Sequence, residues 1–291
     1  MIAIIDADVV MHRVGYTTEN DEEWIARVRT DEMLDGILVA TSAKSFELWL
    51  SDDRENNFRA KVFPQYKANR VAPRPKHYDF IKGHMIREWG ARIAHCMEAD
   101  DALGIAQDKS GCETVICSID KDLLQIPGQH YNFVKGEWDC VTAWEGLKFF
   151  YKQVLTGDVT DNVQGCRGIG PVKASKAIDP ITEAQGEQGL FRAVYETYRK
   201  AEAKLRLTED QTLSNILLAG RLLKIRQSEE EKEWDFPSYK LIEELRQSST
   251  PPVQGVSTPS TVPTTPENTA GFQSRGPLTE PTSSVDPTAS T

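Results

Sequence analysis

The chain is poor in the features that mark secreted, disulfide-rich or membrane proteins. Its 291 residues include five cysteines, an odd number without a CxxC pair, so reduced thiols are expected in place of a disulfide framework, a metal site or a redox pair. The start MIAIID reaches an aspartate before an apolar signal-peptide core can form, and no apolar run is long enough to cross a bilayer. These absences predict a globular protein of the cytoplasm, with one large or two modest domains and no membrane contact.

Apolar side chains are also scarce at the C-terminus. Residues 248–291 contain eight prolines and eighteen Ser or Thr among 44 residues. Such a segment cannot bury enough surface to offset its ordering entropy, so we expect it to be disordered. A tether to other proteins and a solubilising tail are both compatible with this composition.

The net charge of −10 argues at first sight against a nucleic-acid partner. The negative charge, however, is concentrated in five short clusters that hold eleven carboxylates. Without these clusters residues 1–247 carry a net charge of +3, and residues 54–92 hold ten Lys or Arg against three acids. A basic stretch beside a group of acids suits a polyanion that is bound and then cut, although a solvated surface also accounts for the basic stretch alone.

Apolar periodicity divides the chain into an α/β part and a helical part. Short apolar runs alternate with amphipathic segments up to residue 156, which predicts a mainly parallel sheet covered by helices on both faces. The following residues are helical to about 226, with a short extended piece near 234–239, so we expect a first domain at 1–156 and a second at 157–247. The predicted strands are 2–5, 46–50, 91–94, 114–118 and 130–134, and the predicted helices of the first domain are 21–43, 76–89, 100–109 and 143–156.

Each of the five acidic clusters follows an apolar strand-like run or lies at a turn. The carboxyl ends of parallel strands meet at one edge of a sheet, so these carboxylates are expected to converge there. Converging carboxylates repel one another and stay ionised only around a strong cation, and oxygen ligands select Mg²⁺ or Mn²⁺ over zinc. The clusters are Asp6/Asp8, Asp52/Asp53, Glu98/Asp100/Asp101, Asp120/Asp122 and Asp158/Asp161.

The acidic residues also fit two roles that need no metal. A single Asp or Glu after a strand commonly caps the next helix, although one cluster in each βα unit is harder to account for in this way. The start of the chain also resembles the nucleophile motif of haloacid-dehalogenase-type phosphatases, in which Asp6 would attack phosphorus and Asp8 would act as acid and base. The spacing of Asp158 and Asp161 does not match the second acidic pair of those phosphatases.

The segment VFPQYKANR, residues 62–70, combines an aromatic side chain with cations. Pro64 is expected in the first turn of a helix that places Tyr66 and Arg70 on one face, with Lys67 beside them. Such a group can stack a terminal base and bind the adjacent phosphate, or it can be an ordinary surface helix.

The segment GDVTDNVQGCRGIGPVKASKAI, residues 157–178, is the most specific in the chain. Its glycines predict a tight hairpin, after which a proline starts a helix that carries two lysines. Glycines let a phosphate approach the backbone, and free N–H groups at a helix start bind it without reading sequence, so a grip on a duplex backbone is predicted, with a plain turn between helices as the alternative. These residues are Gly165, Gly168, Gly170, Pro171, Lys173 and Lys176.

In this order, the motifs YKANR, EADD, SIDKDLLQIP and GDVTDN…GCRGIGPVKA resemble those of the 5′ nuclease family, which includes flap endonucleases and the 5′ nuclease domain of bacterial DNA polymerase I. The resemblance covers residues 1 to about 240 and is strongest to the 5′–3′ exonucleases of short-tailed bacteriophages. It implies a PIN-like (Rossmann-like) α/β domain that carries the metals, followed by an all-helical domain with a helix–three-turn–helix, or helix-hairpin-helix, module that holds duplex DNA. It also implies two Mg²⁺ ions, which Mn²⁺ can replace, and a K⁺ ion at the hairpin from Gly165 to Pro171.

The resemblance further implies roles for individual residues. The first metal is assigned Asp6, Asp52, Glu98 and Asp100, with Asp101 close by, and the second is assigned Asp120, Asp122, Asp158 and Asp161. Lys67 and Arg70 match the phosphate-steering pair and Tyr66 the base-stacking position, and the catalytic set is Lys67, Arg70, Asp6, Asp100 and Asp120. Duplex contacts are assigned to Tyr66, Lys67, Arg70, Gly165, Arg167, Gly168, Gly170, Lys173 and Lys176. Asp8 and Asp53 lie outside the shared pattern and are expected to be neighbours of the ligands.

The implied function is metal-dependent hydrolysis at 5′ ends of duplex DNA, RNA primers and short flaps, in phage DNA replication or recombination in the cytoplasm of an infected host. A flap endonuclease, a PIN-type ribonuclease and a non-catalytic junction-binding relative are the alternatives. Pro73 and Pro75 interrupt any continuous arch helix after YKANR, which argues against threading of a 5′ end through a closed arch. A monomer is expected, with any coupling to replication proteins made through the tail.

Overall fold

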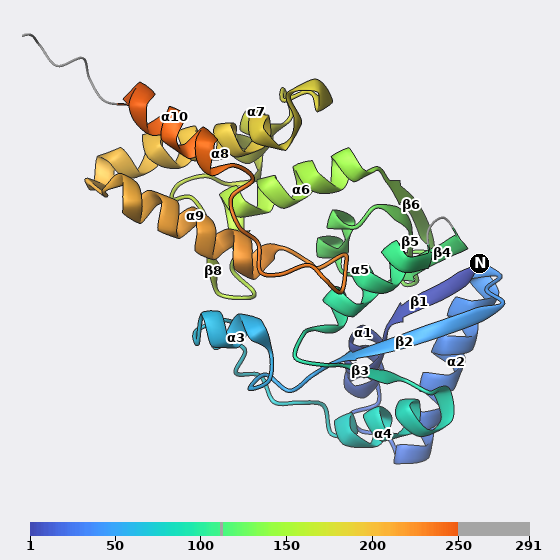
Figure 1. Cartoon of the computed structure of the whole chain (residues 1–291). Coiled ribbons are helices and arrows are strands. Elements are labelled where there is room, and N and C mark those ends of the chain that lie inside the picture. Colours follow the sequence, from blue (N-terminus) through green and yellow to red (C-terminus); the bar gives the residue numbers. More distant parts are fainter. Residues whose placement is uncertain (111–112, 250–291) are drawn as a thin grey trace, which may run out of the picture. The chain divides into compact units, whose positions relative to one another are not determined.

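A six-stranded sheet forms the centre of the N-terminal part of the chain in the computed structural model, which describes residues 1–110 and 113–249 (Figure 1). The strand order is β3-β2-β1-β4-β5-β6, and every neighbouring pair is parallel except β5 and β6, which are antiparallel. The strands are β1 (Ile2–Asp6), β2 (Ser45–Ser51), β3 (Arg92–Ala94), β4 (Thr114–Cys117), β5 (Gly128–Asn132) and β6 (Glu137–Val141).

Helices cover both faces of this sheet, which confirms the predicted fold class. α1, α2 and α4 share one apolar cluster with the sheet, and α5 packs on the opposite face in a second cluster that contains Ile4, Leu103 and Ile116. β1 and β4 are almost fully buried, which is why IAII and TVIC show no alternation of apolar and polar residues. The helices here are α1 (Ala7–Thr17), α2 (Glu23–Thr41), α3 (Phe58–Val62), α4 (Tyr78–Trp89) and α5 (Ala99–Ser110).

The C-terminal part of the described chain is helical and has its own apolar core (Figure 1). α6 packs against α7, α8 and α9, and buried aromatic rings such as Phe150, Tyr195 and Trp234 lie in this core. Residues Met1–Ser249 together form one compact unit. The elements are α6 (Ala143–Thr156), α7 (Pro171–Ile178), α8 (Gly186–Glu202), α9 (Glu209–Leu223) and α10 (Tyr239–Ser249), with the short pieces η2 (Lys121–Gln125), η3 (Glu183–Gln185), η4 (Ala203–Leu205), β7 (Gly157–Asp158) and β8 (Val163–Gln164).

Sequence analysis does not predict α1, α3, β6 or α10. α1 is missed because no turn residue separates it from β1: Asp6 ends the strand and also caps the helix, accepting a hydrogen bond from the Val9 N–H at 3.1 Å. α10 ends at Ser249, so two residues assigned to the disordered tail belong to a helix. The rest of that predicted tail, residues 250–291, lies outside the described residues.

The helix predicted to begin at Pro64 is wrong. α3 ends at Val62, and residues 64–69 form consecutive turns. Lys67 has a φ of 55°, and its backbone N–H donates to the Asp161 carbonyl at 2.9 Å. A contact with a turn that is distant in sequence therefore decides the local backbone conformation and places Lys67 beside residues 158–161.

Gly165, the residue after β8, lies close to the backbone at the end of α6 and the start of β7. A Cβ atom there would lie 2.2 Å from the Gly157 nitrogen and 2.7 Å from the Leu155 oxygen, both of which are backbone atoms. We expect Gly165→Ala to lower the free energy of unfolding by about 3 kcal/mol, because the extra carbon displaces the backbone. Gly170→Ala is the matched control, since a Cβ there meets no atom within 4 Å. Urea unfolding measures both variants, and equal stability of the two would contradict the close approach.

The cysteines of the described chain are free. Cys117 and Cys166 are buried, whereas Cys96 and Cys140 are exposed, and Cys112 lies outside the described residues. None of the helices within residues 1–110 and 113–249 is both long enough and apolar enough to cross a membrane.

Candidate active site

Carboxylates gather where the strand order of the sheet reverses, between β1 and β4. Ligands of open α/β sheets bind beside such a point, at the carboxyl ends of the strands. Asp6 ends β1, Asp120 follows β4 as the cap of η2, and Asp100 lies in the first turn of α5. We call Asp6, Asp8, Glu98, Asp100 and Asp120 the strand-end cluster, because each of these charges acts on at least one other member.

Burial and mutual repulsion both act on this cluster. Asp6 is 3% exposed, and its burial together with the charge of Asp8 raises its pKa to about 7. Burial, followed by the charges of Asp6 and Asp120, raises the pKa of Asp100 well above its ordinary value. Burial also raises the pKa of Asp8, which accepts a hydrogen bond from the Ser51 N–H at 3.0 Å. The cluster therefore concentrates negative charge that the surrounding protein does not fully stabilise.

Asp122 and Asp158 form a second group, which Asp120 links to the first. Burial and the charges of Asp120 and Asp158 raise the pKa of Asp122 to about 7. One carboxylate oxygen of Asp122, Oδ1, is buried without a hydrogen-bond partner. Asp158 accepts hydrogen bonds from the N–H groups of Thr160 at 2.7 Å and Asp161 at 3.2 Å, which order the turn after α6.

Lys67 and Arg70 bring positive charge to both groups. The Lys67 ammonium pairs with Glu98 and lies 3.5 Å from Asp161, and Arg70 also pairs with Asp161. Burial opposes ionisation of Glu98, but Lys67 and Arg59 outweigh it and lower the pKa of Glu98 to about 2. Lys67 is 18% exposed and Arg70 is 52% exposed, so the guanidinium is the more accessible of the two cations.

Tyr66 does not occupy the exposed base-stacking position that the resemblance implies. The residue is 2% exposed and belongs to the core of the helical part. Its hydroxyl donates to Glu98 at 2.8 Å and lies 3.0 Å from an oxygen of Asp161. Tyr66 therefore positions two carboxylates and has no free face for a base, because its ring fills a core that sequence periodicity does not reveal.

Sequence analysis also misses three aromatic rings near the strand-end cluster. The ring of His12 lies 6.1 Å from that of Tyr16 and 5.5 Å from that of Tyr78, and the Arg74 guanidinium lies 4.4 Å from the Tyr78 centroid. Asp8, His12 and Tyr16 are spaced by four along α1, so they share one face of this helix. Tyr16 is 54% exposed. The spacing would have revealed this aromatic stripe if α1 had been predicted.

Asp101, which the resemblance places close to the first metal, is the partner of a buried arginine. Its side chain is 0% exposed, and Arg59 binds its two oxygens at 2.5 and 2.8 Å. The backbone N–H groups of Glu98 and Arg226 donate to the same carboxylate. Both oxygens of Asp101 therefore have partners within the protein, and its place near the first metal stays a prediction.

Asp52 and Asp53 lie after β2 and face different surroundings. Asp52 accepts hydrogen bonds from the Asn56 side chain and the Cys96 N–H, both at 2.9 Å, and these bonds lower its pKa to about 2. In the described part of the chain, none of the leading charge effects on Asp6, Asp100 or Asp122 comes from Asp52. Asp53 is exposed. The hydrogen bonds fix Asp52 at the end of β2, and its assignment to the first metal stays a prediction.

The carboxylates converge without forming a closed set of ligands. Within residues 1–110 and 113–249, no three Asp, Glu, His or Cys side chains are grouped so that they could hold an ion. Lys67 and Arg70 form ion pairs with Glu98 and Asp161. The donors nevertheless fit a hard divalent cation: they are all carboxylate oxygens, several resist ionisation through mutual repulsion, and one oxygen of Asp122 lacks a partner.

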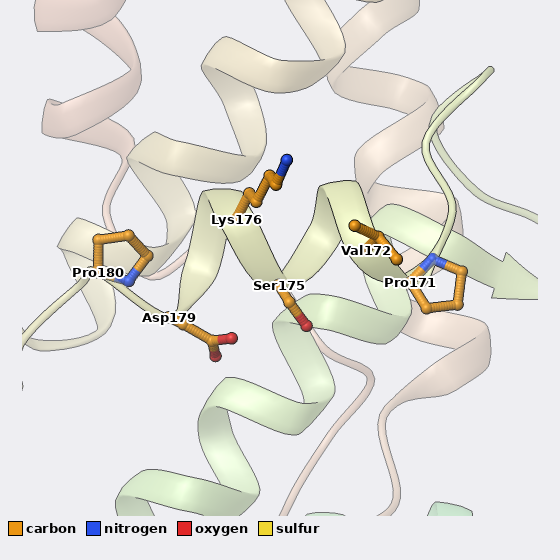
Figure 2. Close-up of a pocket in the computed structure, with 6 residues that line it drawn as sticks. All are labelled: Pro171, Val172, Ser175, Lys176, Asp179 and Pro180. Carbon is orange, nitrogen blue, oxygen red and sulfur yellow. The ribbon is translucent and has the colours of Figure 1, made fainter.

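The glycine hairpin leads into α7, whose start and lysines lie where sequence analysis places them. Gly168 has a φ of 76°, Pro171 is the first residue of the helix, and the Lys173 ammonium donates to the Gly168 carbonyl at 2.8 Å. Figure 2 shows Pro171 at one end of α7 and Pro180 just past the other. Together with Val172, Ser175, Lys176 and Asp179 they line a surface cavity of about 620 Å³. Gly165 lies at the base of this hairpin, and Arg167 and Gly170 are exposed on it.

A family comparison decides what this combination of elements represents. The model of the family described as "5′-3′ exonuclease, N-terminal resolvase-like domain" matches residues 1–153, which is more than half of the chain. The chain belongs to this 5′–3′ exonuclease family. Membership confirms the family expected from the motifs and agrees with the mainly parallel sheet.

Individual relatives of this exonuclease family match different shares of the chain. A DNA polymerase I of Rhizobium leguminosarum is 33% identical over 146 residues, which cover 44% of this chain and 14% of the polymerase. A 5′-3′ exonuclease of Buchnera aphidicola (subsp. Schizaphis graminum, strain Sg) is 28% identical over 190 residues, 58% of this chain and 66% of that protein. The crystal structure of the T5 D15 protein with metal ions has the same fold, with a TM-score of 0.50 and 14% identity, and covers 76% of this chain and 94% of that one.

The raised carboxyl pKa values predict how the stability of this 5′–3′ exonuclease family member depends on pH. Asp6 and Asp122 have pKa values of about 7 in the folded protein against an ordinary value of 3.8, so the folded state binds more protons between these values. The free energy of unfolding should therefore decrease as pH rises towards 7 and be lowest above it. We expect a lower melting temperature at pH 8.5 than at pH 6.5 in EDTA, and a smaller decrease for Asp122→Asn. Thermal melts that rise with pH over this range would contradict the repulsion.

Proposed function

We propose that this chain is a divalent-metal-dependent 5′–3′ exonuclease that hydrolyses phosphodiester bonds at the 5′ ends of duplex DNA. The observation that carries the proposal is the pair of carboxylate groups joined by Asp120 and bordered by Lys67 and Arg70. Membership of the 5′–3′ exonuclease family supports it. RNA primers and short 5′ flaps would be further substrates, because the backbone phosphates that the protein contacts are common to DNA and RNA.

The two carboxylate groups would divide two metal ions between them. Asp6, Glu98 and Asp100 would hold one ion, and Asp122, Asp158 and Asp161 the other, with Asp120 between them. When bound, Mg²⁺ or Mn²⁺ supplies an activated water and neutralises the charge of the leaving oxygen. The chemistry needs no covalent step of the haloacid-dehalogenase type, because Asp6 serves as a metal ligand and not as a nucleophile.

The cations beside these groups would bind the phosphates. Lys67 contacts Glu98 and lies close to Asp161, so its ammonium can turn from a carboxylate to the scissile phosphate and stabilise the charge that develops there. Arg70 is half exposed and can bind the neighbouring phosphate with two parallel hydrogen bonds. Their release would free oxygens of Glu98 and Asp161 for the metal ions.

The remaining surfaces would hold the DNA on either side of the cut. His12, Tyr16 and Tyr78, with Arg74, offer an aromatic surface on which a base of the substrate strand can stack. The glycine hairpin and the start of α7 would hold the duplex through its backbone phosphates. This arrangement would serve phage replication or recombination, in which primers and short flaps are removed.

An exonuclease is favoured over an endonuclease that threads a closed arch. Between α3 and α4 the described residues 63–77 contain no helix, so no continuous arch helix covers the site. This segment is also held against α1, since the Tyr16 hydroxyl donates to the Pro73 carbonyl at 3.2 Å and Pro75 packs on Gly15. A 5′ end could then reach the carboxylates from the open side.

A nuclease assay on 5′-labelled duplex tests the proposal. The wild type should release nucleotides in Mg²⁺ and stop when EDTA is added, with much of its DNA binding retained. Asp122→Asn and Asp158→Asn should each slow release by on the order of a hundredfold, because each removes a charged metal ligand. Rates near that of the wild type in both variants would sink the assignment, and binding without release by the wild type would favour the junction-binding alternative.

A further inference from the structure

A cavity of about 490 Å³ lies beside the proposed active site but contains none of its proposed metal ligands. Asn69 lines it next to Arg70, and Val159 and Asn162 line it on either side of the turn that ends in Asp161. Helix α9 completes the wall. The cavity therefore opens between two turns. One carries Lys67 and Arg70, and the other carries Asp158 and Asp161.

A buried carboxylate with one unpaired oxygen lines this cavity. Glu202, the last residue of α8, is 5% exposed, and its Oε1 accepts a hydrogen bond from the Asn215 side chain at 3.0 Å. Its other oxygen, Oε2, is buried and has no partner. Of the side chains that the structure describes, no Lys, Arg or His forms an ion pair with Glu202.

The unfavourable free energy of this unpaired carboxylate points to a ligand that donates a hydrogen bond to it. A buried carboxylate without a cation is unfavourable, and its place at the C-terminus of α8 adds repulsion from the helix dipole. Neighbouring groups do not relieve it: burial and the charge of Glu202 raise the pKa of the Cys166 thiol to about 12, and the Tyr198 hydroxyl donates to the Val154 carbonyl at 2.8 Å. The terminal torsion of a Glu side chain is soft, so either oxygen can turn towards a donor in the cavity.

The rest of the lining suits a planar ring. Phe63, Leu218 and Leu222 provide apolar surface, while Asn69 and Asn162 add amide groups. A volume of this size with mainly apolar walls and a few polar groups is typical of sites for small organic molecules and larger than a bare cation needs. The Glu202 charge would repel a phosphate but accept a hydrogen bond from the amino group of cytosine, adenine or guanine.

We propose that this cavity binds an unpaired nucleobase of the substrate, through an exocyclic amino group that donates a hydrogen bond to Glu202. The inference rests on the proposed function, because the base belongs to the nucleic acid that the enzyme cuts. Thymine lacks an exocyclic amino group, and its one ring donor, N3–H, is flanked by two carbonyl oxygens that the Glu202 charge repels, so an unpaired thymine binds less well. The enzyme is thus selective for the unpaired base next to the cut, although it holds the duplex without reading its sequence.

Binding of duplexes with a single-nucleotide 5′ flap tests this proposal without cleavage. The dissociation constant is measured in EDTA by fluorescence anisotropy, for flaps of dC, dT and an abasic site. The wild type should bind the dC flap about tenfold more tightly than the dT flap, as expected for a hydrogen bond to a charged acceptor. Glu202→Gln presents an amide donor in place of the second oxygen, so it should lose or reverse the preference for dC. Equal affinity of the wild type for all three flaps would overturn the proposal.

Two further variants keep the result unambiguous. Glu196→Gln changes a half-exposed carboxylate on the same helix and should retain the preference for dC. Asn215→Trp should fill the cavity and abolish the difference between flaps; because it also removes the hydrogen bond to Glu202 Oε1, its folding is checked by circular dichroism. Retention of the dC preference by Glu202→Gln or by Asn215→Trp would overturn the proposal. Mg²⁺-dependent nucleotide release is measured separately: release without a base preference refutes only the cavity, and a base preference without release refutes only the nuclease.

Discussion

Asp100→Asn is expected to reduce the rate of Mg²⁺-dependent nucleotide release by on the order of 10²- to 10³-fold. Burial, together with the charges of Asp6 and Asp120, raises the pKa of Asp100 well above its ordinary value. The substitution removes one charge from the proposed metal centre and relieves repulsion at the same time. The variant should therefore lose activity while it folds at least as well as the wild type in EDTA. Steady-state rates and thermal melts measure the two effects.

Asp53→Asn is the matched control for this variant. Asp53 follows the same kind of strand end but is exposed and lies outside the strand-end cluster. Its replacement should leave the rate within about twofold of the wild type, since the charge is screened by solvent. An equal loss of activity in both variants would mean that overall negative charge matters and that a specific metal centre does not.

Arg59→Met is expected to lower the free energy of unfolding by about 3–5 kcal/mol, because it leaves the buried carboxylate of Asp101 without a cation. Arg59 is 2% exposed and joins three segments. It binds Asp101 of α5, and it donates to the Leu222 carbonyl at 2.9 Å and the Lys224 carbonyl at 2.7 Å at the end of α9. The loss should therefore loosen the packing of the helical part on the sheet.

The double variant Arg59→Met/Asp101→Leu tests whether the uncompensated charge of Asp101 causes the loss of stability in Arg59→Met. Replacement of both members by apolar residues of similar volume removes the uncompensated carboxylate, so part of the lost stability should return. Urea unfolding of the wild type and both variants measures this recovery. A single variant within 1 kcal/mol of the wild type, or a double variant less stable than the single one, would contradict the stabilising role of the pair.

The sheet and the main acidic residues of the site are predictable from sequence. β1 and β4 are buried on both faces, and such strands are continuous apolar runs that end at the edge where Asp6 and Asp120 meet. Pro171 and the glycines before it predict the hairpin and the start of α7, because these residues restrict or widen the backbone choices locally. Local signals therefore account for the elements and for most of the convergence.

The partners of individual polar groups are not predictable in this way. Whether Tyr66 is exposed depends on the helical core that closes around its ring, and the role of Asp101 depends on Arg59, which is 42 residues away in sequence. Lys67 adopts a positive φ because its N–H reaches Asp161. Each of these outcomes is decided by a contact between distant segments, which residue type and spacing do not predict.

Isothermal titration calorimetry of the metal-free protein with Mn²⁺ at pH 8 tests most directly whether the converging carboxylates form a metal centre. The wild type should bind Mn²⁺, and Asp100→Asn should bind it at least about tenfold more weakly, with Asp53→Asn unchanged. No heat of binding in the wild type, or the same affinity in Asp100→Asn, would contradict the assignment of the strand-end cluster.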